Sequence, residues 1–154
     1  MEKLMIKRLS ETAVLPARAT GGSAGYDLCA DIRSPVTILP GETQRLGSGI
    51  AIALPDPGYV ALIFGRSGLG NKHGLTPANA VGVIDSDYRG ELIIGLRNHG
   101  EVPYTVQPGE RIAQLVVLPV HTPELCEVES LDETERGAGG FGSTGRGTLG
   151  GEKQ

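Results

Sequence analysis

Between two apolar segments the chain reads Gly82-Val83-Ile84-Asp85-Ser86-Asp87-Tyr88-Arg89-Gly90-Glu91. An acid, an aromatic ring and an arginine thus stand between glycines, immediately after one apolar run and before another. This pattern predicts two strands joined by a tight, exposed turn that gathers functional side chains.

Similar short apolar segments recur along the chain, with Pro, Gly, Asn or Asp between them. They cover residues 36–39, 50–54, 59–64, 92–96, 104–106 and 112–118. Short β-compatible segments at this spacing predict an all-β sandwich or barrel. Gly41 and Gly109 each follow a proline, which favours a type II turn. We expect one short helix, over residues 67–73.

Composition supports an all-β domain and restricts the binding partners and the cellular location that we expect. The chain has 154 residues, 24 of them Gly and 10 Pro, with four Tyr, two Phe and no Trp, so one domain with an aliphatic core is expected. Cys29 and Cys126 fit no metal spacing, and we expect both to be small buried residues. The net charge of −4 argues against nucleic-acid binding. No apolar run is long enough for a membrane span, and a soluble, cytoplasmic protein is expected.

Five blocks, in order, resemble the signature of the trimeric deoxyuridine triphosphatases, the dUTPases. Besides residues 82–91 they are residues 24–28 (AGYDL), 65–69 (GRSGL), 111–115 (RIAQL) and 136–145. The resemblance runs from about residue 15 to about residue 147. It implies a distorted jelly roll, a homotrimer with shared active sites, and hydrolysis of dUTP to dUMP and diphosphate. That reaction limits uracil incorporation into DNA and supplies dUMP for dTMP synthesis.

The GRSGL block suits an anion, because glycines let backbone N–H groups approach it and Arg66 adds a fork of donors. From the residues alone this indication is weak, because an Arg-Ser-Gly turn is usually only a turn. The resemblance assigns the phosphate chain to Arg66, Ser67 and Gly68, and the α-phosphate to Gln114. We expect Arg111 to be structural. Gly65 stands where family members often have proline.

Asp85 is the expected catalytic acid. Hydrolysis of a phosphoanhydride needs a water aimed at phosphorus, and a carboxylate can orient and deprotonate that water. From the residues alone, a plain hairpin turn explains the Asp85-Ser86-Asp87 run better, but Asp85 matches the catalytic aspartate of the family. Asp27 is expected to support the electrostatics of the site without taking part in the reaction.

Recognition of the nucleoside is expected from residues on either side of Gly82. A ring at Tyr88 would pack on the deoxyribose and leave no room for a 2′-hydroxyl. The Asn79 side chain has a donor and an acceptor that can complement uracil. Backbone groups around Gly82 and Val83 would complete the pairing, an assignment that depends mainly on the resemblance.

From Arg136 onward the chain is rich in Gly, Ser and Thr, so we expect a jelly-roll domain over residues 1–135 and a flexible arm over residues 136–154. In the family this arm closes over the nucleotide. The resemblance therefore assigns substrate contacts to Arg136, Phe141, Gly142 and Ser143, with Phe141 stacked on the base. No metal motif is present, so Mg²⁺ is expected to arrive on the triphosphate, with no dedicated protein ligands.

Two other classes remain open at this stage. A deoxycytidine triphosphate deaminase shares the fold, although no glutamate stands in a convincing position to act as the general acid/base that deamination needs at C4 of the base. A nucleotide-dependent interaction protein without catalysis is the second, and the intact Asp85 argues against it.

Overall fold

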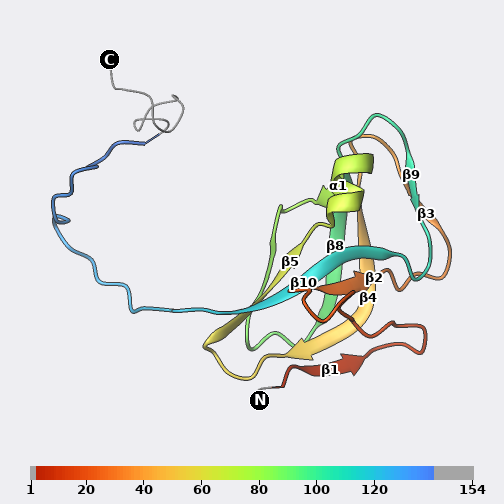
Figure 1. Cartoon of the computed structure of the whole chain (residues 1–154), viewed down its shortest axis with the longest axis horizontal. Helices are drawn as coiled ribbons and strands as arrows, with labels where there is room; N and C mark the ends of the chain where they lie inside the picture. The colour runs from red at the N-terminus through yellow and green to blue at the C-terminus, as the bar shows by residue number, and fades with distance from the viewer. Residues whose placement is uncertain (1–2, 141–154) are drawn as a thin grey trace. The chain divides into compact units, whose positions relative to one another are not determined.

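The computed structural model describes residues 3–140, which form short strands and one helix (Figure 1). In chain order the elements are β1 (Met5–Arg8), β2 (Tyr26–Cys29), β3 (Val36–Ile38), β4 (Thr43–Ala53), β5 (Tyr59–Phe64), α1 (Ser67–His73), β6 (Leu75–Pro77), β7 (Gly82–Ile84), β8 (Glu91–Asn98), β9 (Tyr104–Val106) and β10 (Arg111–Pro119).

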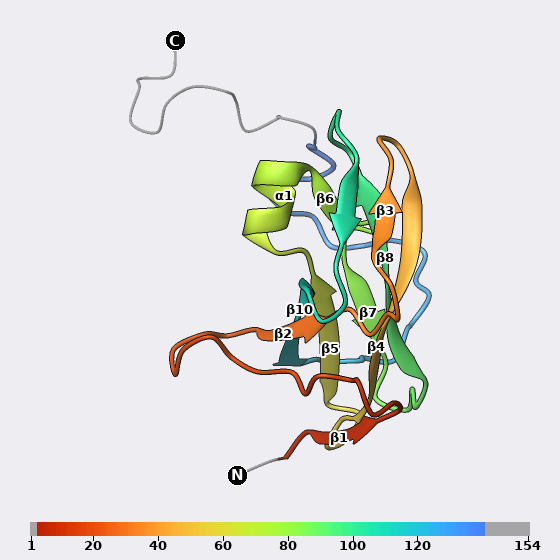
Figure 2. The same ribbon diagram turned by 90° about the vertical axis from the view of Figure 1, so that its right-hand side faces the viewer.

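The strands form two four-stranded sheets and a small ribbon, and every strand pairing is antiparallel. One sheet has the order β1-β4-β8-β6, the other has the order β2-β10-β5-β7, and β3 pairs with β9 in the ribbon (Figures 1 and 2). Neighbours that are distant in sequence make this a jelly-roll-like arrangement without a closed barrel. The predicted all-β fold is confirmed.

The core lies between the sheets and is aliphatic, as the scarcity of aromatic residues predicted. Its most deeply buried large side chains are Leu28, Ile38, Ile50, Leu75, Leu92, Leu96, Val106, Ile112 and Leu115. Residues from both sheets and from the ribbon share this one cluster, so burial of their apolar surface supplies the main drive for folding. Asn98 is also fully buried. Its amide donates to the carbonyls of Ile38 and Val102, and its oxygen accepts from the Gly100 N–H.

Several predicted elements match the structure in detail. Helix α1 spans the predicted residues, and the two Pro-Gly turns are built alike. Gly41 and Gly109 have φ of +79° and +76°, as the third position of a type II turn requires. Each turn is closed by an N–H of its glutamate, from Glu42 to Leu39 (2.9 Å) and from Glu110 to Gln107 (3.1 Å).

Strands β1, β2 and β6 were not predicted, and β4 begins seven residues before the expected start at residue 50. All four residues of β1 are exposed, so their sequence carries no alternation that marks a buried face. β4 contains a bulge between Gly47 and Ala51, which interrupts its pattern. Gly49 in this bulge has φ +64° and donates its N–H to Glu91 Oε1 (2.7 Å), linking β4 to the first residue of β8.

Contacts divide the chain into two units, Met1–Thr122 and Pro123–Gln154. The described part of the second unit contains no helix or strand. The predicted boundary after residue 135 stays a prediction. The expectation of two buried cysteines is wrong, because Cys29 is only partly buried and Cys126 is exposed. Across residues 3–140 no helix has the length and apolarity to cross a membrane.

Candidate active site

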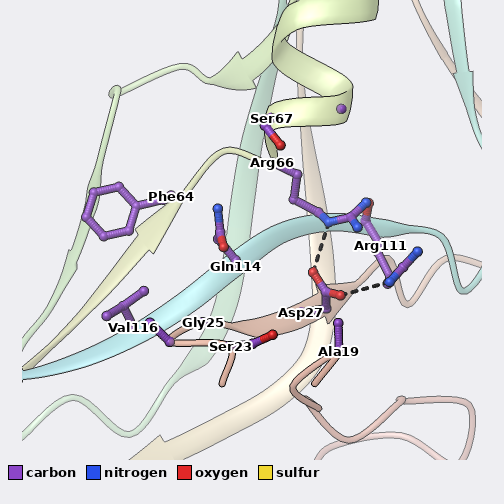
Figure 3. A pocket seen from close by; sticks show the side chains of 12 residues that line it. Ala19, Ser23, Gly25, Asp27, Phe64, Arg66, Ser67, Arg111, Gln114 and Val116 are labelled. Carbon is purple, nitrogen blue, oxygen red and sulfur yellow. Dashed lines mark hydrogen bonds and ion pairs between the residues drawn. The ribbon is translucent and has the colours of Figure 1, made fainter. Parts of the chain in front are cut away.

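A pocket of about 420 Å³ opens beside the first turn of α1 (Figure 3). It is lined by Ala19, Ser23, Ala24, Gly25, Asp27, Phe64, Arg66, Ser67, Gly68, Arg111, Gln114 and Val116. Strand register explains how distant residues meet here. Gln114 on β10 pairs with Asp27 on β2 and with Phe64 on β5, so their side chains form one row across the sheet.

Two arginines of this pocket are held by one carboxylate. Asp27 Oδ1 accepts from Arg66 Nε (2.9 Å), and Asp27 Oδ2 accepts from Arg111 Nη1 (3.0 Å) (Figure 3). Arg66 Nη1 also donates to the Arg111 carbonyl oxygen (3.2 Å). The side chain of Asp27 is 18% exposed and that of Arg66 is 26% exposed. One carboxylate between two guanidinium groups leaves a net positive charge, with guanidinium donors still available to an anion.

Gln114 is oriented by its neighbours. Its Nε2 donates to the Gly65 carbonyl oxygen (2.8 Å), which uses one of the two amide hydrogens. A Cβ on Gly25 would lie 2.8 Å from Gln114 Oε1, so only glycine at residue 25 leaves this rotamer room. The carbonyl of Gly65 thus holds the amide beside Arg66, a function that the sequence did not indicate.

Helix α1 starts at Ser67, with Arg66 as its N-cap residue in an extended conformation. The first N–H groups of any α-helix have no partner within the helix. No atom outside the helix lies within 4 Å of the position that a Cβ on Gly68 would take, so the backbone there is open to a ligand. The ring of His73, at the other end of the helix, packs against the ring of Tyr104 at a tilt of 56°, with 4.9 Å between the ring centroids, and so links α1 to β9.

Asn79, Gly82 and Val83 lie at a second pocket, of about 360 Å³, which shares no residue with the first. Ile63 lines this second pocket and Phe64 lines the first. Because successive side chains on a strand point to opposite faces, β5 separates the two pockets.

The segment that leads from Asn79 to Gly82 is conformationally unusual. Ala80 has φ +62°, and no other non-glycine residue among residues 3–140 has a positive φ. The Val81 N–H donates to the Asn79 carbonyl oxygen (2.7 Å) across it, which makes a tight γ-turn. Such strain is typical of functional loops.

Asp85 and Tyr88 lie on the turn between β7 and β8, and both are exposed. The turn is held by its own groups. The Tyr88 N–H donates to the Asp85 carbonyl oxygen (3.2 Å), and Arg89 Nη1 donates to the carbonyls of Ser86 (2.7 Å) and Tyr88 (2.9 Å). Neither Asp85 nor Tyr88 is among the residues that line the two pockets.

Within the described residues, the predicted site residues therefore fall into separate groups. Asp27, Arg66, Ser67, Gly68 and Gln114 share one pocket, while Asn79, Gly82 and Val83 share another. Arg136, in the second unit, donates from Nε to the Gly139 carbonyl oxygen (2.9 Å). Phe141, Gly142 and Ser143 lie outside the described residues.

Sequence reasoning missed residues both in the first pocket and at the turn that follows β7. It treated Arg111 as structural, yet the guanidinium lines the pocket beside Arg66. Gly25 and Gly90 stand inside the quoted blocks but were given no function, because the reason for a glycine is the atom that lies close to it in space.

No group of three or more His, Cys, Asp or Glu side chains that could hold a metal ion occurs within residues 3–140. The one carboxylate of the first pocket, Asp27, already accepts from two arginines. Cys29 lies nearby, and burial, followed by the negative charge of Asp27, raises the pKa of its thiol. Its thiol is therefore a poor metal ligand and a poor nucleophile at neutral pH.

Comparison with known proteins matches this chain to one family over nearly its whole length. A family model described as dUTPase matches residues 11–145. Relatives named deoxyuridine 5'-triphosphate nucleotidohydrolase include that of Alcanivorax borkumensis, 50% identical over 144 residues, or 94% of this chain and 96% of the relative. That of Ralstonia pickettii is 53% identical with the same coverage of both chains.

Solved structures agree. A mutant dUTPase of Staphylococcus bacteriophage 80alpha with dUpNHpp has a TM-score of 0.86 at 33% identity, and the match covers 95% of this chain and 100% of that one. A mutant dUTPase of phage phi11 of S. aureus, which coordinates a structural Mg(II) ion, has a TM-score of 0.77 at 29% identity, covering 85% and 99%. This chain belongs to the dUTPase family and is an enzyme of that family.

Proposed function

We propose that this enzyme hydrolyses dUTP to dUMP and diphosphate, by attack of water at the α-phosphorus. The observation that carries the proposal is the pocket in which Asp27 aligns Arg66 and Arg111 beside Gln114. It supplies oriented cationic and amide donors for a polyphosphate. The names of relatives about 50% identical along nearly the whole chain support uracil as the base.

The phosphate chain would enter this pocket from the open side of α1. Arg66 uses Nε and Nη1 within the protein, which fixes the plane of its guanidinium and leaves Nη2 for phosphate oxygens. Gln114, held by the Gly65 carbonyl, has a second amide hydrogen for the α-phosphate. The Ser67 hydroxyl and the backbone at Gly68 would add neutral donors. Donors held in advance stabilise the developing charge without reorganising during the reaction.

Asp85 would accept a proton from the attacking water and orient it. A carboxylate can act as a base toward a water that it positions. The proton moves from the water to Asp85, a bond forms from the water oxygen to the α-phosphorus, and the bond to the bridging oxygen breaks. Diphosphate leaves with that oxygen.

Nucleoside selection would come from the second group of residues. Asn79 and the backbone at Gly82 and Val83 would read the uracil edge, and the γ-turn at Ala80 would hold the Asn79 peptide in place. The ring of Tyr88 would pack against the deoxyribose and exclude a 2′-hydroxyl. Selection of dUTP would limit uracil incorporation into DNA and supply dUMP for dTMP synthesis.

Sites shared between copies of the chain follow from the separation of these groups. β5 stands between the two pockets, so one copy offers its phosphate pocket on a different face from its base-binding residues. We therefore propose a homotrimer, in which one copy faces its phosphate pocket to the Asp85 turn of another.

The arm would complete the site after nucleotide binds. Arg136 and Ser143 would contact the γ-phosphate, Phe141 would stack on uracil, and Gly142 would let the backbone approach the substrate. Ordering of the arm on binding costs free energy, but closure also excludes water from the reacting atoms.

Magnesium fits this scheme only as a partner of the triphosphate. Among the described residues the pocket holds guanidinium, amide and hydroxyl groups, and its one carboxylate is engaged by arginines. Mg²⁺ prefers phosphate oxygens and water over such a donor set. When bound there, it would neutralise part of the triphosphate charge.

Diphosphate release with Mg²⁺ from dUTP, dCTP, dTTP and UTP tests the reaction. Release from dUTP in large excess over the other three is expected. Release of ammonia from dCTP would instead identify the enzyme as a deoxycytidine triphosphate deaminase. Silence with all four would refute the proposal and leave a nucleotide-dependent interaction protein.

Asp85→Asn is the sharpest variant for the chemistry. An amide keeps the size of the side chain but cannot accept the proton, so kcat should fall about 10²- to 10⁴-fold. Because Asp85 is exposed, the melting temperature should not change. Activity that survives this substitution would rule out Asp85 as the base.

A further inference from the structure

We infer that Gly90 determines sugar specificity, because the absence of a side chain there lets the Tyr88 ring lie where it can exclude a 2′-hydroxyl. The inference rests on the proposed function for the use of the ring. It adds a residue that no sequence block marks as a contact, since Gly90 itself need not touch the nucleotide.

The Tyr88 ring folds back over residue 90. A Cβ on Gly90 would lie 2.5 Å from Tyr88 Cζ and 3.0 Å from Tyr88 Cε2, and closer still to the phenolic oxygen. Carbon atoms at ordinary van der Waals separation stand at about 3.5–4.0 Å. The ring therefore cannot keep this position beside any other residue type at position 90.

Gly90 is required for space and not for backbone conformation. Positive φ occurs within residues 3–140 at Gly41, Gly49, Gly74, Gly109 and Gly137, and Gly90 is not one of these glycines. An alanine at residue 90 could thus adopt the native backbone. The atoms nearest to the added methyl group all belong to the Tyr88 side chain, so the substitution should displace that side chain alone.

The ring is held separately from the backbone of the turn. Tyr88 is 42% exposed, and its hydroxyl makes one hydrogen bond, to the Glu91 carbonyl oxygen (3.0 Å). The turn backbone is held separately, by the Tyr88 N–H on Asp85 and by Arg89 on two carbonyls. A methyl group at residue 90 should move the ring and leave the backbone that carries Asp85 in place.

Sugar selection and chemistry should therefore separate in Gly90→Ala. We expect the ratio of kcat/KM for dUTP to that for UTP to fall at least about tenfold, while kcat for dUTP falls less. Tyr88→Ala should give a similar ratio. Adding Gly90→Ala to Tyr88→Ala should cause no further change, because the clashing ring is gone.

Gly21→Ala is the matched control, since nothing lies within 4 Å of a Cβ at residue 21. It should leave the ratio unchanged. If Gly90→Ala alone folds poorly, the double variant with Tyr88→Ala should restore folding, since the ring is the only strained group. Restoration would support the inference, and its absence would overturn it.

Two kinetic results would refute the inference. One is an unchanged dUTP to UTP ratio in a folded Gly90→Ala enzyme. The other is a further loss of selectivity when Gly90→Ala is added to Tyr88→Ala. Ring signals of Tyr88 in NMR spectra provide a test that does not need activity. They should shift in Gly90→Ala and not in Gly21→Ala, and unshifted signals would overturn the geometry. A wild-type enzyme inactive on dUTP would refute the proposed function. The NMR spectra would then still decide whether a side chain at residue 90 displaces the Tyr88 ring.

Discussion

At Gly74 a single residue ends helix α1 and meets a distant segment. Its φ is +69°, in the left-handed region, and its N–H donates to the Gly70 carbonyl oxygen (3.0 Å). A Cβ there would lie 2.9 Å from Gly100 Cα and closer to the Gly100 nitrogen, both of them backbone atoms. Glycine is thus required twice, for conformation and for space.

Gly74→Ala should lower the free energy of unfolding by about 3 kcal/mol or more, because strain and a backbone clash act together. Gly109→Ala is the matched control. It shares the positive φ, +76°, but has nothing within 4 Å of a Cβ, so it should cost only about 1 kcal/mol. Urea unfolding of both variants measures the difference. Equal losses would show that the Gly100 contact yields readily.

At the scale of elements, the two strands of the β3–β9 ribbon are each followed by a turn of the same construction. The turn after each strand has the form Pro-Gly-Glu, and the glutamate side chain returns to the first residue of the turn. Glu42 Oε2 accepts from the Leu39 N–H (3.1 Å), and Glu110 Oε2 accepts from the Gln107 N–H (2.9 Å). The second turn has an added contact, because the Tyr104 hydroxyl donates to Glu110 Oε1. The ring of Tyr104 also contacts the ring of His73, so Tyr104 links this ribbon to the end of α1.

Alkaline pH should weaken this link. Burial raises the pKa of Tyr104 to about 12, and the hydrogen bond to Glu110 and the charge of Glu110 add to the effect. The neutral phenol is favoured in the folded state, so the folded protein holds its proton where the unfolded chain, with an ordinary pKa of 10.0, has lost it. The contribution to stability is complete below pH 10 and is lost as pH rises toward about 12.

Urea unfolding between pH 9 and pH 12 measures this loss, in a range set by the ordinary and the raised pKa of Tyr104. In Tyr104→Phe the decline at alkaline pH should be smaller than in the wild-type enzyme. A decline of equal size in both would assign it to other groups.

At the scale of the whole molecule, each proposed active site combines groups from two copies of the chain. Two variants that are inactive alone should therefore restore activity to each other in mixed trimers. Arg66→Ala and Asp85→Asn should each be inactive alone. Doubly tagged trimers all contain both variants and should regain about a third of the wild-type activity, since each holds one site of three with both groups intact. Co-expression with two affinity tags and assay of the doubly tagged enzyme measures this. Arg66→Ala mixed with Gln114→Ala is the control, because both residues line one pocket of one copy and no site regains both. Absence of rescue would mean that each site is formed by one copy.

Removal of the arm should separate folding from turnover. A chain that ends after residue 135 should retain its strand content and oligomeric state, because the buried core lies within residues 13–115. Turnover should fall about 10²-fold or more, since cationic contacts and exclusion of water are lost. Circular dichroism and light scattering provide the structural control. Loss of fold or of the trimer would contradict a purely catalytic arm.

The sequence alone predicted the elements whose signals are local. Helix α1, β5 and β9 were predicted with their observed bounds, and the glycines of the two type II turns have the required φ. Strand β1 was missed because its residues are all exposed, and the start of β4 because a bulge interrupts its pattern. Tertiary pairing stabilises such segments without leaving an apolar period in the chain.

For the site, the sequence determined which chemical groups are present, because motif spacing specifies residue types along the chain. The tertiary structure decided which groups meet. Strand register aligned Asp27, Gln114 and Phe64, and one carboxylate came to hold Arg66 and Arg111. It also put β5 between that pocket and the residues proposed to bind the base. Gly90 illustrates the difference best, since its importance depends on where the Tyr88 ring lies, and side-chain packing is a three-dimensional property that no linear pattern records.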